Sequence, residues 1–206
     1  MTEPDRQAHW QNVYQTRGEG EVSWSQPSPE PSLGLIEKFA PARSASIVDI
    51  GGGASRLVDA LHERGYRHIT VLDLSETALE SAKARLGADA ISVQWVAADA
   101  TQWQPPQTFD IWHDRAAFHF LVDPRDREAY IARLHQGVKT GGHAIIATFA
   151  LDGPEKCSGL PVRRYDHVAL GKALGPAFAL VYHQPHHHVT PWGAAQSFQF
   201  SVFERT

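Results

Sequence analysis

The residues best suited to chemistry in this sequence are acids and glycines that follow apolar runs. Asp49 lies in the apolar run 46–50, and three glycines follow it at positions 51–53. Asp73 and Asp99 stand at the ends of two later apolar runs. Glycine leaves the backbone bare, so a ligand can approach its N–H groups closely. Because carboxylates accept hydrogen bonds from hydroxyl and amino groups, we expect a ligand site at these positions.

The glycine turn indicates which ligand would bind. A dinucleotide-binding turn has the pattern Gly-x-Gly-x-x-Gly, and here Gly51 and Gly53 fit the first two glycines, whereas Arg56 stands at the third. The carboxylate of Asp49 would also repel two phosphates. S-adenosylmethionine (SAM) carries a sulfonium and an α-amino group instead of phosphates. The sequence therefore favours SAM over NAD as the cofactor.

The elements that must position these residues alternate between strand and helix. Short apolar runs predict strands, and the segments between them predict helices, an order that indicates right-handed crossovers and a parallel sheet. The carboxyl edge of that sheet would then hold the three acids. Five strands are expected at 46–50, 68–74, 91–98, 109–114 and 143–149, helices at 56–65, 75–86, 125–138 and 166–174, and a late antiparallel pair at 178–182 and 196–203.

The segment before the first strand is rich in aromatic residues. Residues 1–8 are expected to be a loose start, followed by a helix that bears Trp10 and Tyr14. Trp24 lies in a loop, and Ser32 is a suitable N-cap for the next helix. The aromatic side chains either cover the edge of the sheet or form a lid that closes over the cofactor, and the sequence leaves both interpretations open.

Composition limits the class of protein. The chain has 206 residues, enough for one α/β domain, and a formal net charge of −4, which disfavours nucleic-acid binding. No apolar run is long enough to span a membrane, and the N-terminus is unlike a signal peptide. The single cysteine suits a reducing compartment, so we expect a cytoplasmic protein. We expect one domain, 1–206, with a lid segment at 1–40, a SAM-binding core at 46–150 and an acceptor segment at 151–206.

With these motifs in order, the sequence resembles the class I SAM-dependent methyltransferases. The resemblance covers roughly residues 9–206 and implies a Rossmann-like α/β fold, with a seven-stranded, mostly parallel sheet, helices on both faces and a C-terminal antiparallel hairpin. Ser55 replaces the last glycine of the family's glycine motif. Residues 10–26 are similar to a branch related to thiopurine-like small-molecule and protein-lysine methyltransferases. The matching motifs are 48–53 (VDIGGG), 71–75 (VLDLS), 98–100 (ADA), 109–115 (FDIWHDR) and 141–146 (GGHAII).

The resemblance implies a role for each matching residue. Asp49 would orient the SAM amino group, Asp73 would bind the ribose and Asp99 would accept the adenine amine. The methyl donor would leave as S-adenosylhomocysteine (SAH). The cofactor-binding residues expected from the motifs are Trp24, Asp49, Gly51, Gly53, Asp73, Leu74, Asp99, Ala100, Asp114 and Arg115.

Methyl transfer is a displacement at an activated methyl, so the protein mainly supplies proximity, and a base is needed only where the acceptor must lose a proton. His113, Asp114 and His119 follow the fourth strand and are candidate bases, of which we expect His119 and Asp114 to be catalytic. Cys157 is expected to be inert. The residues expected to contact the acceptor are His119, Arg163, Arg164, His188 and Trp192.

Histidines gather near the end of the chain, at positions 183 and 186–188. Neither a carboxylate nor a cysteine stands nearby at ligand spacing, so we expect no metal site.

Several functions fit this pattern. The preferred hypothesis is methyl transfer to a small-molecule acceptor by a monomer or homodimer that binds neither nucleic acid nor membranes. An alternative is methylation of a protein side chain such as lysine, which an extended acidic groove would favour. A closed pocket lined by Phe118, Phe120 and Trp192 would favour the small molecule. A non-catalytic SAM-binding module and an NAD oxidoreductase are the remaining alternatives.

Overall fold

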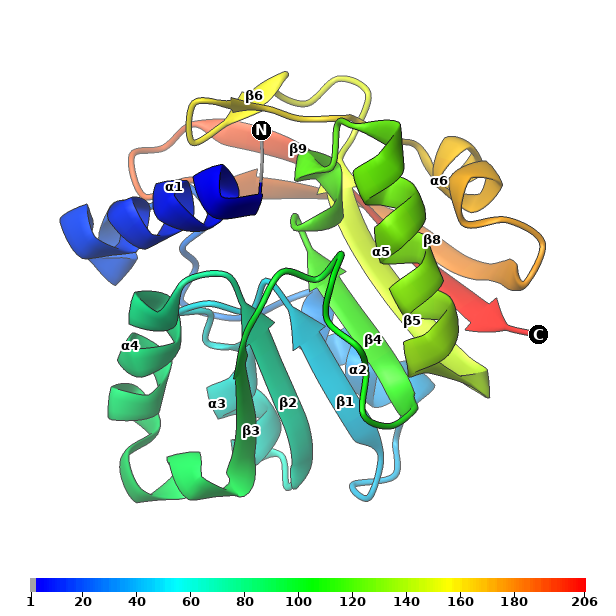
Figure 1. Ribbon diagram of the computed structural model, residues 1–206, viewed down its shortest axis with the longest axis horizontal. Helices are drawn as coiled ribbons and strands as arrows, with labels where there is room; N and C mark the ends of the chain where they lie inside the picture. The colour runs from blue at the N-terminus through cyan, green and yellow to red at the C-terminus, as the bar shows by residue number, and fades with distance from the viewer. Residues whose placement is uncertain (1–2) are drawn as a thin grey trace.

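The computed structural model describes residues 3–206, which form a seven-stranded sheet flanked by helices (Figure 1). The strand order is β3-β2-β1-β4-β5-β9-β8. The first five strands in chain order run parallel, whereas β9 is antiparallel to both β5 and β8. The expected fold class, a mostly parallel α/β sheet with a C-terminal antiparallel hairpin, is confirmed. The strands are β1 Ser46–Ile50, β2 His68–Asp73, β3 Val93–Ala97, β4 Phe109–Arg115, β5 Val138–Phe149, β8 Phe178–Val189 and β9 Ala195–Arg205.

Helices cover both faces of this sheet. One face packs against α2 (Ser32–Phe39), α3 (Leu57–Glu63) and α4 (Glu76–Leu86). The opposite face packs against α5 (Pro124–Gly137) and α6 (His167–Leu174). This division follows from right-handed crossovers on the two sides of β1, where the strand order reverses.

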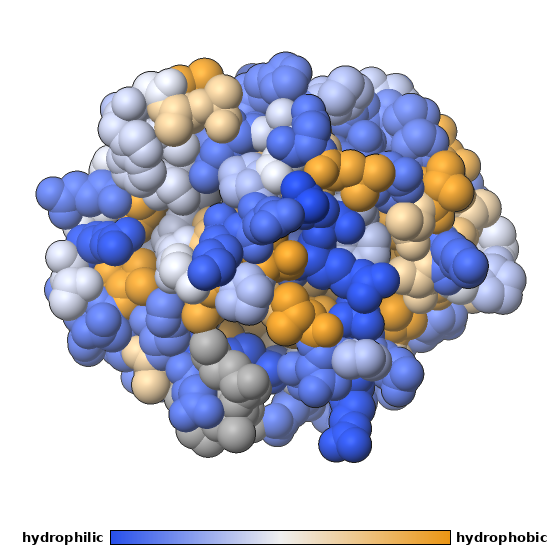
Figure 2. All heavy atoms as spheres, turned by 90° about the horizontal axis from the view of Figure 1, so that it is seen from above, coloured by the Kyte–Doolittle hydropathy of each residue, from blue (hydrophilic) through white to orange (hydrophobic). Residues whose placement is uncertain are grey.

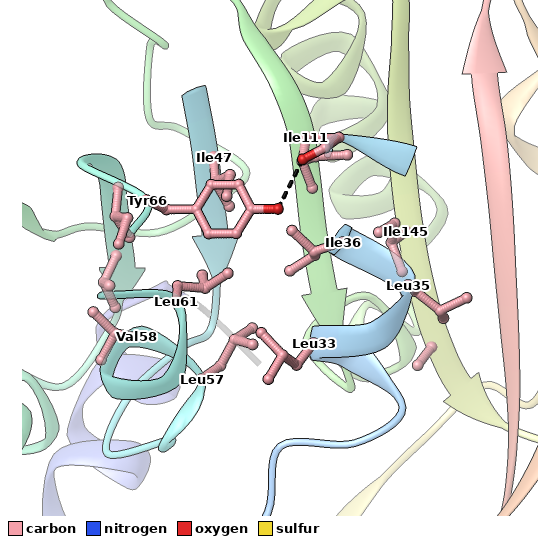
Figure 3. Close-up of a cluster of buried hydrophobic side chains, with 14 of the residues drawn as sticks. Leu33, Leu35, Ile36, Ile47, Leu57, Val58, Leu61, Tyr66, Ile111 and Ile145 are labelled. Atoms are coloured by element: carbon pink, nitrogen blue, oxygen red, sulfur yellow. Dashed lines mark hydrogen bonds between the residues drawn. The ribbon is translucent and has the colours of Figure 1, made fainter. Parts of the chain in front are cut away.

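Apolar residues at helical spacing explain why α2 and α3 form and where they bind. Leu33, Ile36 and Leu61 meet Ile47 of β1 in one buried cluster (Figure 3). Within it, the buried hydroxyl of Tyr66 donates a hydrogen bond of 2.8 Å to the carbonyl of Ala40, so the one polar atom there is satisfied. Burial of each such aliphatic side chain stabilises the fold by roughly 1.5–3 kcal/mol. The cluster fixes β1, and with it the glycine turn.

The N-terminal segment differs from the expectation. Helix α1 spans Glu3–Thr16, so most of residues 1–8 are helical rather than a loose start, and residues 1–2 lie outside the described part. The helix lies across the ends of β2 and β3 (Figure 1), where Gln11 contacts Ser75 and Thr77. Tertiary hydrogen bonds therefore order a segment whose own sequence pattern is weak.

Three boundaries also differ. A 3-10 helix, η2 (Gly87–Ser92), replaces the predicted start of β3 at residue 91. β8 continues to Val189, so the histidines at 186–188 belong to a strand and not to the predicted connection. Two short strands that the sequence analysis does not predict, β6 (Lys156–Cys157) and β7 (Leu160–Pro161), form a hairpin after β5.

The short 3-10 helices η1 (Glu19–Glu21) and η3 (Phe118–Phe120) complete the described elements. Over the residues described, every helix is too short or too polar to cross a membrane.

Candidate active site

The glycine turn after β1 is held tightly against its neighbours. Gly51 and Gly53 have φ of +68° and +48°, which favour glycine, and the N–H of Gly51 donates to the carbonyl of Leu72 in β2 at 2.8 Å. A Cβ on Gly51 would lie 2.9 Å from the Cβ of Ala117. A Cβ on Gly53 would lie 2.8 Å from the Tyr14 hydroxyl oxygen. Neither position can carry a side chain without a clash, and of the two only Gly51 borders a cavity.

Asp73 ends β2 beside this turn. Its Oδ1 accepts a 2.8 Å hydrogen bond from the N–H of Ser75, and its Oδ2 faces Gly53. Burial raises the pKa of Asp73 to about 7, although hydrogen bonds from the backbone oppose the shift and nearby Asp49 adds to it. A carboxylate so poorly solvated gains from any hydroxyl donor that a ligand brings, as a ribose would.

Asp99 follows β3 and has a different neighbour. Its Oδ1 accepts from the N–H and hydroxyl of Thr101 at 2.8 and 2.7 Å, and its Oδ2 lies 2.6 Å from Nη2 of Arg6. Arg6 also pairs with Asp126 of α5 at 2.5 Å. Burial acts to raise the pKa of Asp99, but hydrogen bonds from Thr101 and Arg6 outweigh burial and lower it. An adenine amine would therefore have to share the carboxylate with Arg6.

A cavity of about 120 Å³ joins these strand ends to an aromatic region. Seven residues that the motifs predict to bind the cofactor border this cavity, and we call their part of the wall the cofactor side: Trp24, Gly51, Asp73, Leu74, Asp99, Ala100 and Arg115. Phe120, from the expected acceptor pocket, also borders the cavity. Its other walls come from Arg6, Trp10 and Tyr14 of α1, Phe149 of β5, Cys157 of β6, and Gln196 and Phe198 of β9.

We call the aromatic region the acceptor chamber and define it by Trp10, Phe120, Phe149, Cys157, Gln196 and Phe198. The ring of Trp10 contacts those of Phe120 and Trp24 edge to face, at centroid distances of 4.9 and 5.7 Å. Figure 2 views the molecule from above relative to Figure 1 and shows small hydrophobic patches separated by hydrophilic side chains on that side.

A second cavity of about 540 Å³ lies on the other side of the turn. Asp49, Gly52, Ser32 and His113 all contribute to its wall, and Arg115 borders both cavities. Gly53 borders neither, but its contacts with Tyr14 and Asp73 place it in the wall between them.

Arg115 connects β4 to the N-terminal loop. Its Nη1 donates to the carbonyl of Trp24 at 3.1 Å, and its Nη2 donates to Oε1 of Gln26 at 3.0 Å. Burial lowers the pKa of Arg115 to about 10, while Cys157 and Asp49 act to raise it. The guanidinium remains a cation at neutral pH, and both of these acceptors are neutral groups.

Asp114 is not placed to act as a catalytic base. The side chain is fully buried and does not border either cavity. Its oxygens accept hydrogen bonds from the N–H groups of Ala117 (2.8 Å) and Phe118 (3.1 Å) and from the Tyr130 hydroxyl (2.5 Å). Burial raises the pKa of Asp114 to about 6. We interpret Asp114 as the residue that shapes the loop after β4.

His119 is likewise turned away from the cavity. It is fully buried between Phe120 and Phe149, and its Nδ1 accepts from the N–H of Phe149 at 3.3 Å. Burial, reinforced by the charge of Arg115, lowers the pKa of His119 to about 3. A histidine that resists protonation so strongly is a poor general base. His113, the other candidate, contacts Asp49 instead.

The expected acceptor residues are mostly elsewhere. Arg164 pairs with Glu155 and the carbonyl of Gly153, and Arg163 lies over the ring of Tyr165, so neither borders the cavity. Trp192 is 60% exposed. Cys157 borders the cavity, and burial raises the pKa of its thiol to about 11, so the thiol stays neutral.

The histidines of β8 have structural contacts. Nε2 of His188 lies 2.6 Å from the carbonyl of Ser23 and so fastens β8 to the N-terminal loop, outside both cavities. His183 stacks on His167 of α6 at 3.7 Å between ring centroids. Among residues 3–206, His, Cys, Asp and Glu form no group of three that could hold a metal ion.

Sequence reasoning missed Arg6, Phe149, Gln196 and Phe198. Arg6 gave no signal because its two acid partners are distant in the chain. Phe149 and Phe198 gave a partial signal, since each alternates with polar residues at the end of a predicted strand and must face one side of the sheet.

Comparison with known proteins agrees with this geometry. Residues 47–142 match a family model described as a methyltransferase domain. Among curated proteins, the eEF1A lysine and N-terminal methyltransferases of Bos taurus and Homo sapiens are each 24% identical over 149 residues. The match covers 69% of this chain and 21% of each relative, so the chain corresponds to about a fifth of their length.

Solved structures resemble the chain over most of its length. The 1,6-didemethyltoxoflavin-N1-methyltransferase of Burkholderia thailandensis has a TM-score of 0.77 and 21% identity, and the match covers 100% of this chain and 91% of that one. A structure from work on the conversion of a disulfide bond into a thioacetal during echinomycin biosynthesis has a TM-score of 0.76 and 21% identity, covering 97% and 92%. The matched methyltransferase domain, the sheet order and the glycine turn support a SAM-dependent methyltransferase of the class I type, with SAM as cofactor.

Proposed function

We propose that this methyltransferase acts on a small, flat acceptor without positive charge, bound in the acceptor chamber. The observation that carries the proposal is the aromatic wall itself, because Trp10, Phe120 and Phe198 line the same cavity as Gly51 and Asp73. Aromatic side chains bind planar apolar surfaces well and offer little to a flexible charged chain.

The charges around the chamber support the same class of acceptor. Arg115 is a cation at the junction between the chamber and the cofactor side, and the thiol of Cys157 is neutral. The described carboxylates that border the cavity, Asp73 and Asp99, lie at its cofactor side. A lysine ammonium would enter beside a cation and find no carboxylate partner in the chamber, which is unfavourable in a poorly solvated site.

The contributions of the protein are binding and alignment. SAM supplies an activated methyl when bound. Asp73 would hold the ribose hydroxyls, the bare turn at Gly51 would let the methionyl part approach, and Trp24 with Tyr14 would exclude water. Because Asp114 and His119 are fully buried and border neither cavity, no proton transfer is assigned to them. The acceptor would therefore be a group that is nucleophilic without help from a protein base.

The experiment that tests this proposal is a screen for transfer of the labelled methyl of SAM to small heteroaromatic and phenolic acceptors, with whole-cell protein as a parallel substrate. Label in small molecules, lost in Phe120→Ala and kept in the exposed control Trp192→Ala, supports the proposal. Label that enters protein alone contradicts it.

A protein acceptor is the second candidate, because the curated relatives methylate lysine and N-terminal groups by their names. Because the identity is low and the matched segment is short, these relatives show only a general similarity to this chain. For this function α1 would have to move away from the chamber, and methylation of protein would then be insensitive to Phe120→Ala.

A further inference from the structure

A chain of three buried polar side chains runs from α2 to the glycine turn. Asp49 in β1 and His113 in β4 are partners in the parallel register, so their side chains share one face of the sheet. Nδ1 of His113 lies 2.6 Å from Oδ1 of Asp49, and Nε2 lies 2.8 Å from Oγ of Ser32. Each of the three residues is no more than 3% exposed.

The direction of these hydrogen bonds follows from the chemistry of the groups. A carboxylate can only accept, so Nδ1 of His113 carries the proton that it shares with Asp49. Nε2 of His113 shares the second hydrogen bond with the hydroxyl of Ser32, which can donate or accept. Both ring nitrogens of His113 are held by hydrogen bonds, so the ring in turn holds the carboxylate of Asp49 in one orientation.

Ser32 has this role in place of the one predicted for it. Helix α2 begins at Ser32 itself, and Pro31 occupies the N-cap position without a side-chain hydrogen bond. The hydroxyl therefore points across to the sheet rather than back to its own helix. Leu33, Leu35 and Ile36 anchor α2 in the core, so the position of Ser32 is rigid.

The second oxygen of Asp49 faces the turn. A Cβ placed on Gly52 would lie 2.6 Å from Oδ2, which means that only glycine at this position leaves room for the carboxylate. Asp49, Gly51 and Gly52 border the cavity of about 540 Å³ together with His113 and Ser32. The acid is thus held at the wall of a space that a ligand can enter.

We propose that Ser32 and His113 are positioning residues that preset Asp49 for the α-ammonium of the cofactor's methionine end. A buried carboxylate is costly unless donors satisfy it, and the preset orientation removes the cost of ordering it when the cation arrives. The proposal rests on the SAM assignment and is independent of the acceptor.

The test compares two ligands that differ only at the methionine end. SAH carries the amino acid group, whereas 5′-methylthioadenosine has the same nucleoside and lacks it. Affinities are measured by calorimetry for the intact protein, His113→Val and His113→Asn. Val removes the donor, while the amide of Asn can replace the Nδ1 proton. We expect His113→Val to lose about tenfold in SAH affinity, methylthioadenosine to stay within about twofold, and His113→Asn to recover most of the loss.

Equal loss for both ligands would show a merely structural role and overturn the proposal, as would unchanged affinity for both. If the intact protein binds methylthioadenosine and SAH equally well, Asp49 does not read the amino group and the proposal also fails, although the cofactor site stands. If it binds neither, the SAM assignment itself fails.

Should His113→Val not fold, Ser32→Ala provides the same comparison with a smaller perturbation. It should lower SAH affinity by about threefold without changing methylthioadenosine affinity. In the intact protein, proton NMR should show a downfield imidazole resonance from the Asp49–His113 hydrogen bond, and its absence would contradict the assignment. Labelling of Ser32 by a fluorophosphonate would identify it as a nucleophile and overturn the positioning role.

Discussion

The cofactor side of the site and the acceptor chamber are built in different ways. On the cofactor side, Asp73 and Asp99 lie at strand ends and each has a partner close in sequence, Ser75 and Thr101. Longer-range pairs add to these, namely Asp99 with Arg6 and Asp49 with His113. The chamber instead brings together side chains of α1, η3, β5, β6 and β9. A site of local contacts tolerates change elsewhere in the chain, whereas a site of distant contacts can change its specificity when any one contributor changes.

The largest expected effect lies on the cofactor side. Asp73→Ala removes the carboxylate placed for two ribose hydroxyls, and hydrogen bonds to a charged group contribute about 1.5–3 kcal/mol each. We expect SAM affinity by calorimetry to fall by about 100-fold, with Trp192→Ala unchanged. Affinity within about threefold of the intact protein would remove Asp73 from the site.

In the acceptor chamber, we expect a substitution to weaken binding of the acceptor and to leave SAM binding unchanged. Phe198→Ala should raise the KM for the acceptor by about tenfold and leave SAM affinity unchanged, because the ring borders only the chamber end of the cavity. Steady-state kinetics with both substrates varied separates the two constants. A parallel loss of SAM affinity would mean that the two regions are not separable.

Arg6 joins the two regions, since it comes from α1 and pairs with Asp99 and Asp126. Arg6→Met keeps much of the volume and removes the charge. We expect a destabilisation of about 1–3 kcal/mol and faster hydrogen exchange confined to α1.

Arg125→Met, at an exposed position of α5, is the matched control for loss of an arginine. An Arg6→Met protein with unchanged exchange in α1 would show that the helix is held by its other contacts.

The pH dependence of stability tests the burial of Asp73. Its folded pKa of about 7 lies above the ordinary value of 3.8, so its stabilising contribution is complete below about pH 4 and is lost as the pH rises through 7. Asn cannot ionise. In the absence of cofactor, the Tm of Asp73→Asn minus that of the intact protein should therefore increase from pH 5 to pH 8. A difference independent of pH would contradict the raised pKa.

The smallest effect is expected at His119. His119→Asn retains an acceptor for the N–H of Phe149, and a residue with a pKa of about 3 has no proton transfer to lose near neutrality. Turnover should stay within about threefold across pH 6–9. A hundredfold loss of turnover with unchanged SAM affinity would restore His119 as the general base.

The contrast also explains what could be predicted from sequence. Periodicity and the spacing of Asp49, Asp73 and Asp99 were sufficient to predict the sheet and to place these acids at or near its strand ends, because a strand end and its acid are close in the chain. Whether a side chain faces the cavity depends on contacts with residues that are distant in the sequence. Asp114 and His119 occur in a motif of the expected kind, yet their side chains face Tyr130 and Phe149 rather than the cavity. Trp192 is exposed to solvent, and Arg164 binds Gly153 and Glu155 instead of facing the cavity.

Helix α1 is fastened at two places, by Gln11 to the start of α4 and by Arg6 to α5, and it covers one side of the cavity between them. Loosening of either fastening would uncover that side of the cavity. We therefore expect substitutions that weaken the two fastenings of α1 to change how fast a bound nucleoside leaves more than how tightly it binds.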